Sequence, residues 1–458
     1  MIPQKFMERM REMPGLDFEA FSAALEQSAV RALRVNTVKA NAEKLIPLLP
    51  FSAEPLPFAQ DAFYATEDKV GAHPAHHAGM IYMQDPGAIC TVAAAAPEAG
   101  LHAIDLCAAP GGKTTQLAAA IGDTGILVSN EYVSARCRIL QGNVERMGVR
   151  NTVVTNLDTT VLADFYGPRF DLVVADVPCS GEGMFRKYDV ASDEWSEENV
   201  ANCAVRQREI LQNAAKLVRP GGRLLYSTCT FSLEENEANI DWLLTQYPDF
   251  SLVPVAPEIA NITANGVTFE GCRHDMALCR RFYPHLSPGE GQFVALLERS
   301  EESPLIGVMT RDGLTAPDKK TAEMARCFLA EVLAELPQSM RLTVLRDALW
   351  LTPDFPVPSG GIFAPGVCVG TLQKGRIEPH HQLASALGRQ YRRQVALSQG
   401  DPRVAAYLRG EEIPLSAAET ANGNGYAAVL YEGAPLGGGK IVGDRLKNHY
   451  PKGLRNRT

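Results

Sequence analysis

The amino-acid sequence predicts an α/β fold built on a doubly wound, Rossmann-like parallel sheet. Strands and helices alternate from about residue 88 to residue 300, a pattern typical of β-α-β units. Residues 170–175 are apolar on both faces, as a central parallel strand should be, and a turn of small residues joins the first strand to its helix. At 458 residues the chain is too long for one core, so further, smaller domains are expected.

Residues 1–87 are predicted to form a small α+β domain, RNA-recognition-like in its pattern. A helical pattern covers residues 18–32, residues 33–38 are predicted to be a strand, and several prolines then break the segment into loops. His73, His76 and His77 cluster in this domain, but no carboxylate or cysteine stands at ligand spacing. We therefore expect polar loop residues there and no metal site.

Residues 88–300 are predicted to form the main domain. Its predicted strands cover residues 102–106, 126–130, 152–155, 170–175, 223–227 and 292–297, the last of which closes the sheet. Its predicted helices begin near Lys113, cover residues 138–147, cover residues 206–217 up to a turn at 219–222, and run from a capping box at 232–235 through residue 244.

After a linker at residues 301–304, two small domains are predicted. Residues 305–385 combine a helix at 322–336 with short strands, and residues 386–458 combine a helix near 389–397, a strand at 426–431 and a glycine-rich turn at 437–439 in a β-rich domain. The chain ends with several cations against the single acid Asp444, namely Lys440, Arg445, Lys447, Lys452, Arg455 and Arg457. This tail is either a solvated surface or a local footprint for phosphates.

Composition limits the classes of protein to consider. The formal net charge is −9, which argues mildly against a nucleic-acid partner, although the basic tail argues for one. No apolar run approaches the length of a membrane-spanning helix, and the first residues lack the apolar core of a signal peptide. Ten cysteines occur without a C-x-x-C pair. We expect a cytoplasmic monomer with reduced thiols and with neither a metal nor a membrane partner.

The turn after the first strand is typical of a nucleotide-type cofactor loop. Its small residues let the backbone pass close to a ligand, and the following helix presents free N–H groups toward it. The dinucleotide pattern G-x-G-x-x-G is absent. The phosphate-binding pattern G-x-x-x-x-G-K-[ST] matches at Gly112, Lys113 and Thr114, but Cys107 replaces its first glycine. An NTPase therefore competes with other cofactor-binding enzymes.

The predicted strand ends collect small, acidic and thiol residues along one edge of the sheet, where ligands bind in this architecture. These are Cys107–Lys113 after the first strand, Glu131 after the second, Asp158 after the third, Asp176 and Cys179 after the fourth, and Cys229 after the fifth. Glu131 is placed to accept hydrogen bonds from ribose hydroxyls, a contact that an NTPase does not need.

Cys179 and Cys229 follow adjacent strands and are expected to open onto the same crevice. A thiolate is a strong nucleophile when its surroundings lower its pKa, although a lone cysteine is more often a small buried hydrophobe. Addition of a thiolate to C6 of cytosine turns C5 into a carbon that can attack a methyl sulfonium. Asp176 could then hydrogen-bond the base at N3, once the base is flipped into the crevice.

Three segments resemble the signature blocks of the RsmB/NOP/NSUN family of S-adenosyl-L-methionine-dependent RNA cytosine-C5 methyltransferases. They are Asp105-Leu-Cys-Ala-Ala-Pro-Gly-Gly-Lys-Thr114, Asp176-Val-Pro-Cys-Ser-Gly-Glu-Gly-Met-Phe-Arg-Lys187 and Tyr226-Ser-Thr-Cys-Thr230. The segment Leu446-Lys-Asn-His-Tyr-Pro-Lys-Gly-Leu454 is similar to the ending of the RsmF-type branch, which acts on small-subunit (16S) ribosomal RNA. Val177 departs from the family, which usually has alanine there.

The resemblance implies a role for each matching position. Cys229 would attack C6, Cys179 would assist release of the methylated base, and Asp176 would touch both cofactor and base. S-adenosyl-L-methionine would be held by Cys107, Ala108, Ala109, Pro110, Gly111, Gly112, Lys113, Glu131, Asp158 and Asp176. The C-terminal domain would be PUA-like and would bind RNA, with ribosomal RNA or the small ribosomal subunit as partner.

Two alternatives stay open from the sequence. A P-loop-like NTPase is weakened by Cys107 and leaves the two thiols unexplained. A non-catalytic RNA-binding factor of ribosome assembly agrees with the basic tail but gives both cysteines no task.

Overall fold

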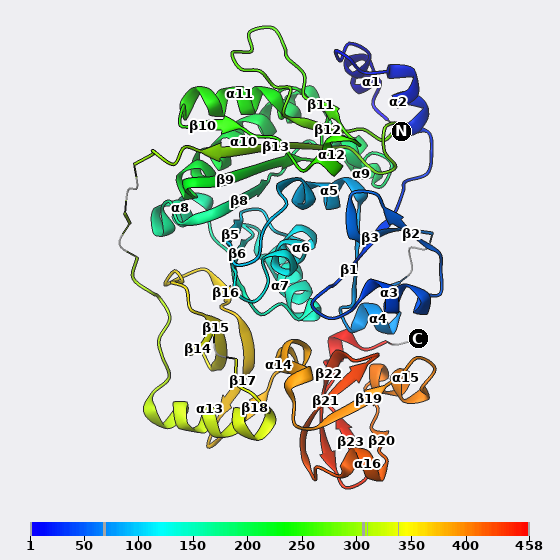
Figure 1. Ribbon diagram of the computed structural model, residues 1–458, viewed down its shortest axis with the longest axis vertical. Helices are drawn as coiled ribbons and strands as arrows, with labels where there is room; N and C mark the ends of the chain where they lie inside the picture. The colour runs from blue at the N-terminus through cyan, green and yellow to red at the C-terminus, as the bar shows by residue number, and fades with distance from the viewer. Residues whose placement is uncertain (1, 67–69, 305–306, 309, 338, 457–458) are drawn as a thin grey trace.

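The computed structural model describes residues 2–66, 70–304, 307–308, 310–337 and 339–456. Figure 1 shows the domain built on the large sheet in the upper part of the molecule, with the N-terminal strands packed beside it and two smaller β-rich units below. Arg457 of the predicted basic tail, and residues 305–306 at the start of the predicted third domain, lie outside the described residues.

The large sheet confirms the predicted doubly wound core and adds antiparallel strands at both edges. Its strand order is β11-β12-β13-β9-β8-β5-β6-β7-β16, with β10 paired to β13. The parallel centre consists of β5 (His102–Asp105), β6 (Ile126–Asn130), β7 (Thr152–Thr155), β8 (Phe170–Asp176) and β9 (Val218–Thr228). The antiparallel strands are β10 (Phe250–Leu252), β11 (Ala264–Asn265), β12 (Arg280–Phe282), β13 (Gln292–Arg299) and β16 (Ile362–Ala364).

Helices cover both faces of this sheet. Leu172 and Val174 of β8 pack toward α5 (Pro86–Ala95), α6 (Gly112–Ile121) and α7 (Ser134–Met147). Val173 and Ala175 pack toward α8 (Thr159–Tyr166), α10 (Glu197–Leu217) and α11 (Glu237–Gln246) on the other face. Because β8 is buried on both faces, its carboxyl end with Asp176 is held firmly at the edge where the predicted site lies. Two short helices, α9 (Asp189–Glu194) and α12 (Pro257–Ala260), complete the domain.

Three predictions for this domain were wrong. Residues 292–297 do not close the sheet, because β12 and β11 continue it beyond β13. Residues 219–222 do not form a separate turn, since β9 runs through them, with Gly221 at a φ of +70° and an irregular register against β8. The capping box at 232–235 does not exist. The helix begins at Glu237 because Ser232 and Glu235 bond to residues of another loop.

The N-terminal region consists of a four-stranded sheet and a separate pair of helices. Its sheet has the order β2 (Ala53–Leu56), β3 (Ala59–Ala65), β1 (Ala32–Val35) and β4 (Ile81–Gln84), with the short helices α3 (Ala42–Leu45) and α4 (Pro74–His77). The helices α1 (Gln4–Arg11) and α2 (Phe18–Leu25) lie apart from it, against the large domain, where Phe6 and Phe21 pack on Phe231. The predicted helix at 18–32 is therefore shorter and ends at Leu25.

The rest of the chain forms two further sheets. The first has the order β14 (Met340–Leu345), β15 (Ala348–Pro353), β17 (Val367–Gln373) and β18 (Arg376–Pro379), and is packed on α13 (Lys319–Val332). The second has the order β19 (Gln394–Leu397), β21 (Gly425–Tyr431), β22 (Ala434–Val442), β23 (Arg445–Asn448) and β20 (Ile413–Pro414). Around them lie α14 (His381–Leu387), α15 (Pro402–Arg409) and α16 (Ala417–Thr420).

Two predictions in the C-terminal region were wrong. Residues 394–397 form the strand β19, not the end of a helix near 389–397. Residues 437–439 lie within the strand β22 and not in a turn. A side chain at Gly437 would meet the Tyr407 hydroxyl at 2.5 Å, so these glycines let the strand lie close to its neighbours. The domain boundaries at 87, 300 and 385 stay predictions, although β16 joins the large sheet from beyond residue 300.

One buried lysine ties these parts together. Lys39 is 3% exposed, and its Nζ donates to Ala78 O at 2.9 Å and to Arg146 O, Ser385 Oγ and Pro435 O at 3.0 Å each. Its acceptors come from the N-terminal segment, α7, α14 and β22. The terminal sheet is thereby fixed relative to the large sheet. In the part of the chain that the structure describes, no helix is long and apolar enough to cross a membrane.

Candidate functional site

A cleft of about 590 Å³ lies between the N-terminal sheet and the carboxyl ends of β5 and β8. Its lining comes from three sources: the small-residue turn, the N-terminal sheet with the segment before α5, and the loop after Asp176. From the predicted cofactor residues it includes Cys107, Ala108, Ala109, Pro110, Gly112, Lys113 and Asp176. This agrees with the ligand position expected for an open α/β sheet.

Two glycines of the turn suit their positions, Gly111 through its backbone conformation and Gly112 through its close approach to the N-terminal sheet. Gly111 has a φ of +111°, where other residues are strained. A side chain at Gly112 would meet Gln84 at 3.2 Å and Tyr82 at 3.3 Å. The buried Arg34 of β1 donates to Gly112 O at 3.2 Å and to Thr115 Oγ1 at 2.8 Å. The N-terminal sheet thus forms one wall of the cleft and holds the turn in place.

Lys113 and Asp176 form an ion pair across the cleft. Lys113 Nζ donates to Asp176 Oδ2 at 2.8 Å, while Asp176 Oδ1 accepts from Ser227 Oγ at 2.6 Å and from Gln292 Nε2 at 3.4 Å. Burial lowers the pKa of Lys113, but the Asp176 carboxylate outweighs it and the net pKa is raised. Lys113 is therefore charged at neutral pH, and its partner is fixed in orientation by three donors.

The two cysteines lie side by side, but neither belongs to the lining of the cleft, so their opening onto it stays a prediction. Cys179 Sγ and Cys229 Sγ are 3.1 Å apart, and both residues are half-buried. The contact with Cys229, together with burial, raises the pKa of Cys179 well above its ordinary value. Cys179 is thus a protonated thiol that touches the second sulfur.

Two buried glutamates join the loops that carry these thiols. Glu182, on the Cys179 loop, accepts from the Cys229 loop: from Thr230 Oγ1 at 2.6 Å, Phe231 N at 2.8 Å and Ser232 Oγ at 2.6 Å. Glu235, beyond Cys229, bonds in the opposite direction to Ser180 N at 3.0 Å and to Ser180 Oγ. Each of the two loops therefore carries a glutamate whose carboxyl group contacts the other loop.

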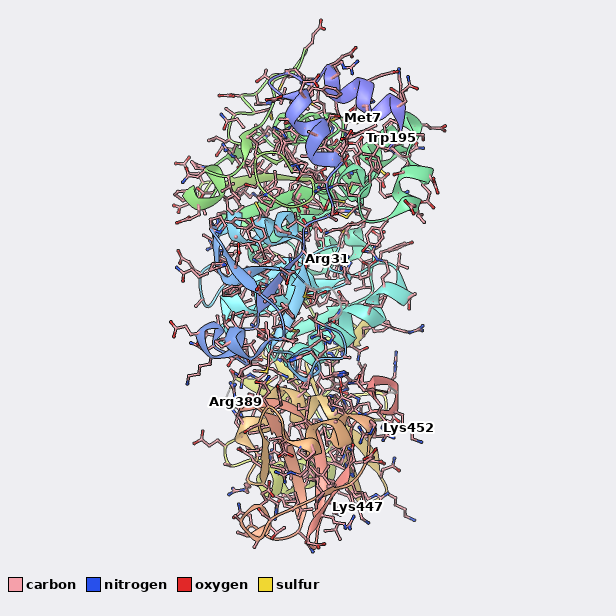
Figure 2. The ribbon with its side chains drawn as sticks, turned by 90° about the vertical axis from the view of Figure 1, so that its right-hand side faces the viewer. Met7, Arg31, Trp195, Arg389, Lys447 and Lys452 are labelled. Carbon is pink, nitrogen blue, oxygen red and sulfur yellow. The ribbon has the colours of Figure 1, made fainter. Side chains whose placement is uncertain are left out.

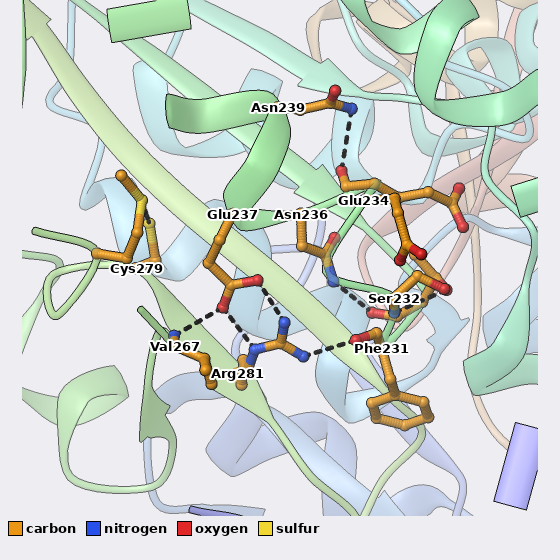
Figure 3. A network of polar contacts seen from close by, with 12 residues as sticks. Phe231, Ser232, Glu234, Asn236, Glu237, Asn239, Val267, Cys279 and Arg281 are labelled. Carbon is orange, nitrogen blue, oxygen red and sulfur yellow. Dashed lines mark hydrogen bonds and ion pairs between the residues drawn. The ribbon is translucent and has the colours of Figure 1, made fainter. Parts of the chain in front are cut away.

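A buried ion pair holds the backbone of the Cys229 loop. Figure 3 shows Arg281 of β12 between Glu237 and the backbone of Phe231. Arg281 Nε donates to Glu237 Oε1 at 2.6 Å and Nη1 donates to Phe231 O at 2.8 Å, and the two charged side chains are 2% and 0% exposed. The ion pair raises the pKa of Arg281 against the opposing effect of burial.

The other two predicted acids lie outside the lining of the cleft. Glu131 follows β6 with a side chain 4% exposed. Its Oε1 accepts from Val133 N at 2.8 Å and its Oε2 lies 3.6 Å from Arg136. Asp158 is exposed and caps α8 by accepting from Thr160 N at 2.8 Å. Both stand at strand ends as predicted, but their contact with a cofactor stays a prediction.

Asp105 is a candidate that the sequence-based prediction did not include. It lines the cleft and is 1% exposed. Its Oδ2 accepts from Thr114 Oγ1 at 2.7 Å, while its buried Oδ1 has no partner. Burial raises the pKa of Asp105 to about 7. Its position at the end of the first strand could have identified it as a candidate from the sequence.

Other cleft residues that the sequence did not reveal come from segments predicted to be structural. Tyr82, Gln84 and Asp85 belong to the N-terminal sheet or follow it, and Lys187 donates to Asp85 Oδ2 at 2.7 Å across the cleft. Glu182 and Glu235 carried no sequence signal of a bridge between loops. No spacing rule links residues that only the fold brings together.

One of the three clustered histidines, His77, makes contacts with the end of the chain. Among the described residues, no group of three or more potential ligands could hold a metal ion. His77 Nδ1 lies 2.8 Å from the Tyr450 hydroxyl and Nε2 lies 2.9 Å from Asn456 Oδ1. His77 therefore joins the N-terminal domain to the end of the chain.

Comparison with known proteins accounts for this arrangement. Family models match residues 92–298 (16S rRNA methyltransferase RsmB/F), residues 2–86 (N-terminal domain of 16S rRNA methyltransferase RsmF) and residues 394–456 (methyltransferase RsmF PUA domain). Proteins named ribosomal RNA small subunit methyltransferase F are 30% identical in Vibrio campbellii and 31% identical in Klebsiella pneumoniae. These alignments cover 99% of this chain, and 97% and 96% of the two relatives.

The chain belongs to the RsmB/F family of 16S rRNA methyltransferases. This membership confirms the predicted rRNA methyltransferase class and favours it over both the NTPase and the non-catalytic interpretation. The predicted cofactor, S-adenosyl-L-methionine, agrees with it.

Solved structures show the same fold over about two thirds of the chain. A methyltransferase homolog from Pyrococcus horikoshii has a TM-score of 0.57 at 26% identity and covers 65% of this chain and 95% of its own. NSun6 from Pyrococcus horikoshii has a TM-score of 0.57 at 21% identity and covers 66% of this chain and 99% of its own. The C-terminal sheet of this RsmB/F family member is its PUA domain.

Proposed function

We propose that this chain methylates C5 of a cytosine in small-subunit ribosomal RNA through a covalent bond between Cys229 and C6. The observation that carries the proposal is the pair of thiols 3.1 Å apart, next to the strand end that presents Asp176. One sulfur is enough for a nucleophile. A second sulfur in contact with it suits a reaction that must also release the nucleophile from its product.

The two thiols divide this work in the proposal. The Cys229 thiolate adds to C6, so that an S–C6 bond forms and electron density moves onto C5 and toward N3. C5 then takes the methyl group that S-adenosyl-L-methionine supplies, and the donor is left as the neutral thioether. The C5 proton is lost to solvent, the C5–C6 double bond forms again, and the electrons of the S–C6 bond return to Cys229 as it leaves. Cys179, whose pKa is raised by its contact with Cys229 and by burial, suits a role beside the departing sulfur.

Asp176 and Lys113 orient the base in this scheme. Asp176 is held by donors from Lys113, Ser227 and Gln292, so its carboxyl group cannot turn away from the cleft. A fixed carboxyl group that gives a proton to N3 neutralises the negative charge that builds on the base when C6 is attacked. The Lys113 ammonium adds a positive charge at the same place. The base must be flipped out of its stack to reach these groups.

The cleft fits the methyl donor on two observations. The buried Oδ1 of Asp105 has no partner and can accept a hydrogen bond from a cationic amino group. The small residues of the turn that line the cleft, among them Gly112, leave its backbone open to the approach of a ligand. Residues 107–113 would hold the donor in this arrangement, and Glu131 and Asp158 would complete its site as the family resemblance implies.

The RNA path runs from the PUA domain to the cleft in this proposal. Lys440, Arg445, Lys447 and Lys452 are exposed, and Lys440 stands opposite Lys447 across β22 and β23. Figure 2 shows Arg31, which lines the cleft, above the terminal domain that carries Lys447 and Lys452. Exposed cations along this route suit contacts to phosphates, which position an RNA without reading its bases.

The test is a methyl-transfer assay with product identification. The purified chain is incubated with methyl-labelled S-adenosyl-L-methionine and either protein-free 16S rRNA or small subunits, and the RNA is digested to nucleosides. We expect the label in 5-methylcytidine, and we expect Cys229→Ala to abolish it. Label in another nucleoside, or undiminished label with Cys229→Ala, would contradict the proposal.

A further inference from the structure

Four oxygen-bearing side chains form a continuous line between the two cysteine loops, which we call the carboxyl–hydroxyl chain: Glu235, Ser180, Thr230 and Glu182. Glu235 Oε1 contacts Ser180 Oγ, Ser180 Oγ lies 2.9 Å from Thr230 Oγ1, and Thr230 Oγ1 lies 2.6 Å from Glu182 Oε2. Glu235 is 0%, Thr230 1%, Glu182 2% and Ser180 6% exposed. The line is therefore shielded from water along its whole length.

The number of hydrogens decides the charge of this chain. Three hydrogen bonds need three hydrogens, but the two hydroxyls of Ser180 and Thr230 supply only two. If both carboxyl groups were ionised, one of the three contacts would join two oxygens with no hydrogen between them. An unmade hydrogen bond in a buried site costs free energy, so the geometry calls for one additional proton.

The contacts of the two carboxyl groups show which one holds that proton. Each oxygen of Glu182 already faces two donors: Ser232 Oγ and Trp195 Nε1 at Oε1, and Thr230 Oγ1 and Phe231 N at Oε2. Each oxygen of Glu182 therefore faces an N–H that can only donate, from Trp195 at Oε1 and from Phe231 at Oε2, and a proton on Glu182 would compete with one of them. Glu235 Oε2 faces two donors in the same way, Ser180 N and Gln207 Nε2.

Glu235 Oε1 is different, because among the described residues its hydrogen-bond contact is a hydroxyl, Ser180 Oγ, which can accept as well as donate, and no N–H competes for this oxygen. With a proton on this oxygen, all hydrogen bonds of the chain point the same way. Glu235 donates to Ser180, Ser180 donates to Thr230, and Thr230 donates to an ionised Glu182. All three contacts then have their hydrogen.

The surrounding charges agree with this distribution. Burial, followed by smaller effects that include the repulsion of Glu182, raises the pKa of Glu235 to about 7 against hydrogen bonds from Ser180 that lower it. The groups that face Glu235 are neutral at that pH: burial raises the pKa of Cys203 to about 11 and that of Tyr226 well above its ordinary value, and the pKa of Cys179 is raised by its Cys229 contact.

Glu182 has a cation on its side instead. The guanidinium of Arg9, in α1, attracts Glu182 and also forms an ion pair with Glu234 at 2.7 Å. Tyr283, another titratable group near Glu182, has a pKa raised by burial and is neutral. An ionised Glu182 and a protonated Glu235 therefore suit their separate surroundings.

We propose that Glu235 is a positioning residue that works in its protonated form, and that the carboxyl–hydroxyl chain it completes fixes the Cys179 loop against the Cys229 loop. When Glu235 loses its proton, one hydrogen bond between the loops can no longer form and the thiols are no longer held in register. The effect on catalysis rests on the proposed function, while the protonation of Glu235 does not.

The first test compares Glu235→Gln with wild type across pH. A glutamine amide can donate to Ser180 Oγ while its carbonyl accepts from Ser180 N and Gln207, so it imitates the protonated acid without titrating. With a pKa of about 7, Glu235 is protonated in about nine tenths of wild-type molecules at pH 6 and in about one tenth at pH 8. The rate of Glu235→Gln divided by the wild-type rate should therefore rise about tenfold over this interval.

Because both proteins contain the same thiols, the titration of the thiols affects both rates equally and cancels in this ratio. The matched control is Glu234→Gln, because Glu234 is the adjacent acid but pairs with Arg9 and has a side chain 47% exposed. Its ratio to wild type should stay constant. A constant ratio for Glu235→Gln as well would overturn the proposal.

The second test needs neither RNA nor methyl donor. The difference infrared spectrum of wild type minus Glu235→Gln should contain the carbonyl band of a protonated carboxylic acid, which disappears with a midpoint near pH 7. The subtraction removes Asp105 and Glu145, whose pKa values burial also raises to about 7. Absence of this band at pH 6 would refute a protonated Glu235, whatever the assay shows.

A variant that keeps Glu235 covers the case in which Glu235→Gln does not fold. Thr230→Val removes one hydroxyl, so Ser180 is free to donate to an ionised Glu235 and the chain no longer needs the additional proton. The carboxylic-acid band should then shift to lower pH by about one unit or more, while Thr230→Ser should restore the wild-type midpoint. An unchanged midpoint in Thr230→Val would contradict the chain.

Discussion

Replacement of Glu237 by glutamine should destabilise the large domain far more than the same change at its neighbour Glu234. Glu237 is 0% exposed and faces Arg281, which is 2% exposed, so Glu237→Gln leaves a guanidinium charge buried without its counter-charge. Breaking a buried ion pair from one side costs about 3–5 kcal/mol. The Glu234 pair with Arg9 has side chains 47% and 25% exposed, and such pairs contribute about 0–1 kcal/mol.

Urea unfolding followed by tryptophan fluorescence measures this difference, because Trp195 and Trp242 both belong to the large domain. Stability should be largely recovered by replacing both partners, as in Glu237→Leu with Arg281→Met, since two apolar side chains leave no unpaired charge. Equal, small decreases for Glu237→Gln and Glu234→Gln would refute the reasoning. Arg281 also holds Phe231 O, so Glu237→Gln should slow methyl transfer through the Cys229 loop.

Three further predictions follow from buried or exposed charges. Lys39→Met removes the donor that four buried acceptors share, and should lower the free energy of unfolding by about 3 kcal/mol and make the junction before the terminal sheet more sensitive to limited proteolysis. Burial raises the pKa of Asp105 from 3.8 to about 7, so its contribution to stability is present at acidic pH and is lost as pH rises through 7. In pH-dependent urea unfolding, wild type should lose about 3 kcal/mol more than Asp105→Asn between pH 4 and pH 7. Lys447→Glu with Lys452→Glu should weaken binding to 16S rRNA and lower the slope of log affinity against log salt by about 1 for each phosphate that is no longer neutralised, and an unchanged salt slope would remove these residues from the RNA path.

Local patterns predicted the centre of the large sheet well. Residues 126–130 and 152–155 coincide with β6 and β7, because each is a short apolar or β-branched run bounded by turn residues. The order of acids and thiols along the sheet edge followed from the fold class. Parallel strands bring their carboxyl ends to one edge, and Cys179 and Cys229 are therefore neighbours.

The predictions failed where a residue distant in sequence contacts the side chains that the local pattern assigned to a helix cap or a turn. The sequence from Ser232 to Glu235 is a well-formed capping box, but Glu182 takes the serine hydroxyl and Ser180 takes the second acid. The glycines of β22 suggested a turn because their close packing against Tyr407 cannot be seen from the sequence. The wall that the N-terminal sheet adds to the cleft was missed for the same reason.

The central claim is that Cys229 forms the bond to the base and that Cys179 is needed to break it. The most direct measurement incubates wild type, Cys179→Ala and Cys229→Ala with S-adenosyl-L-methionine and labelled 16S rRNA, followed by a denaturing gel. The account predicts an RNA–protein adduct that survives denaturation in Cys179→Ala only, and a peptide linked through Cys229 after digestion. An adduct in Cys229→Ala, or none in Cys179→Ala, would contradict it.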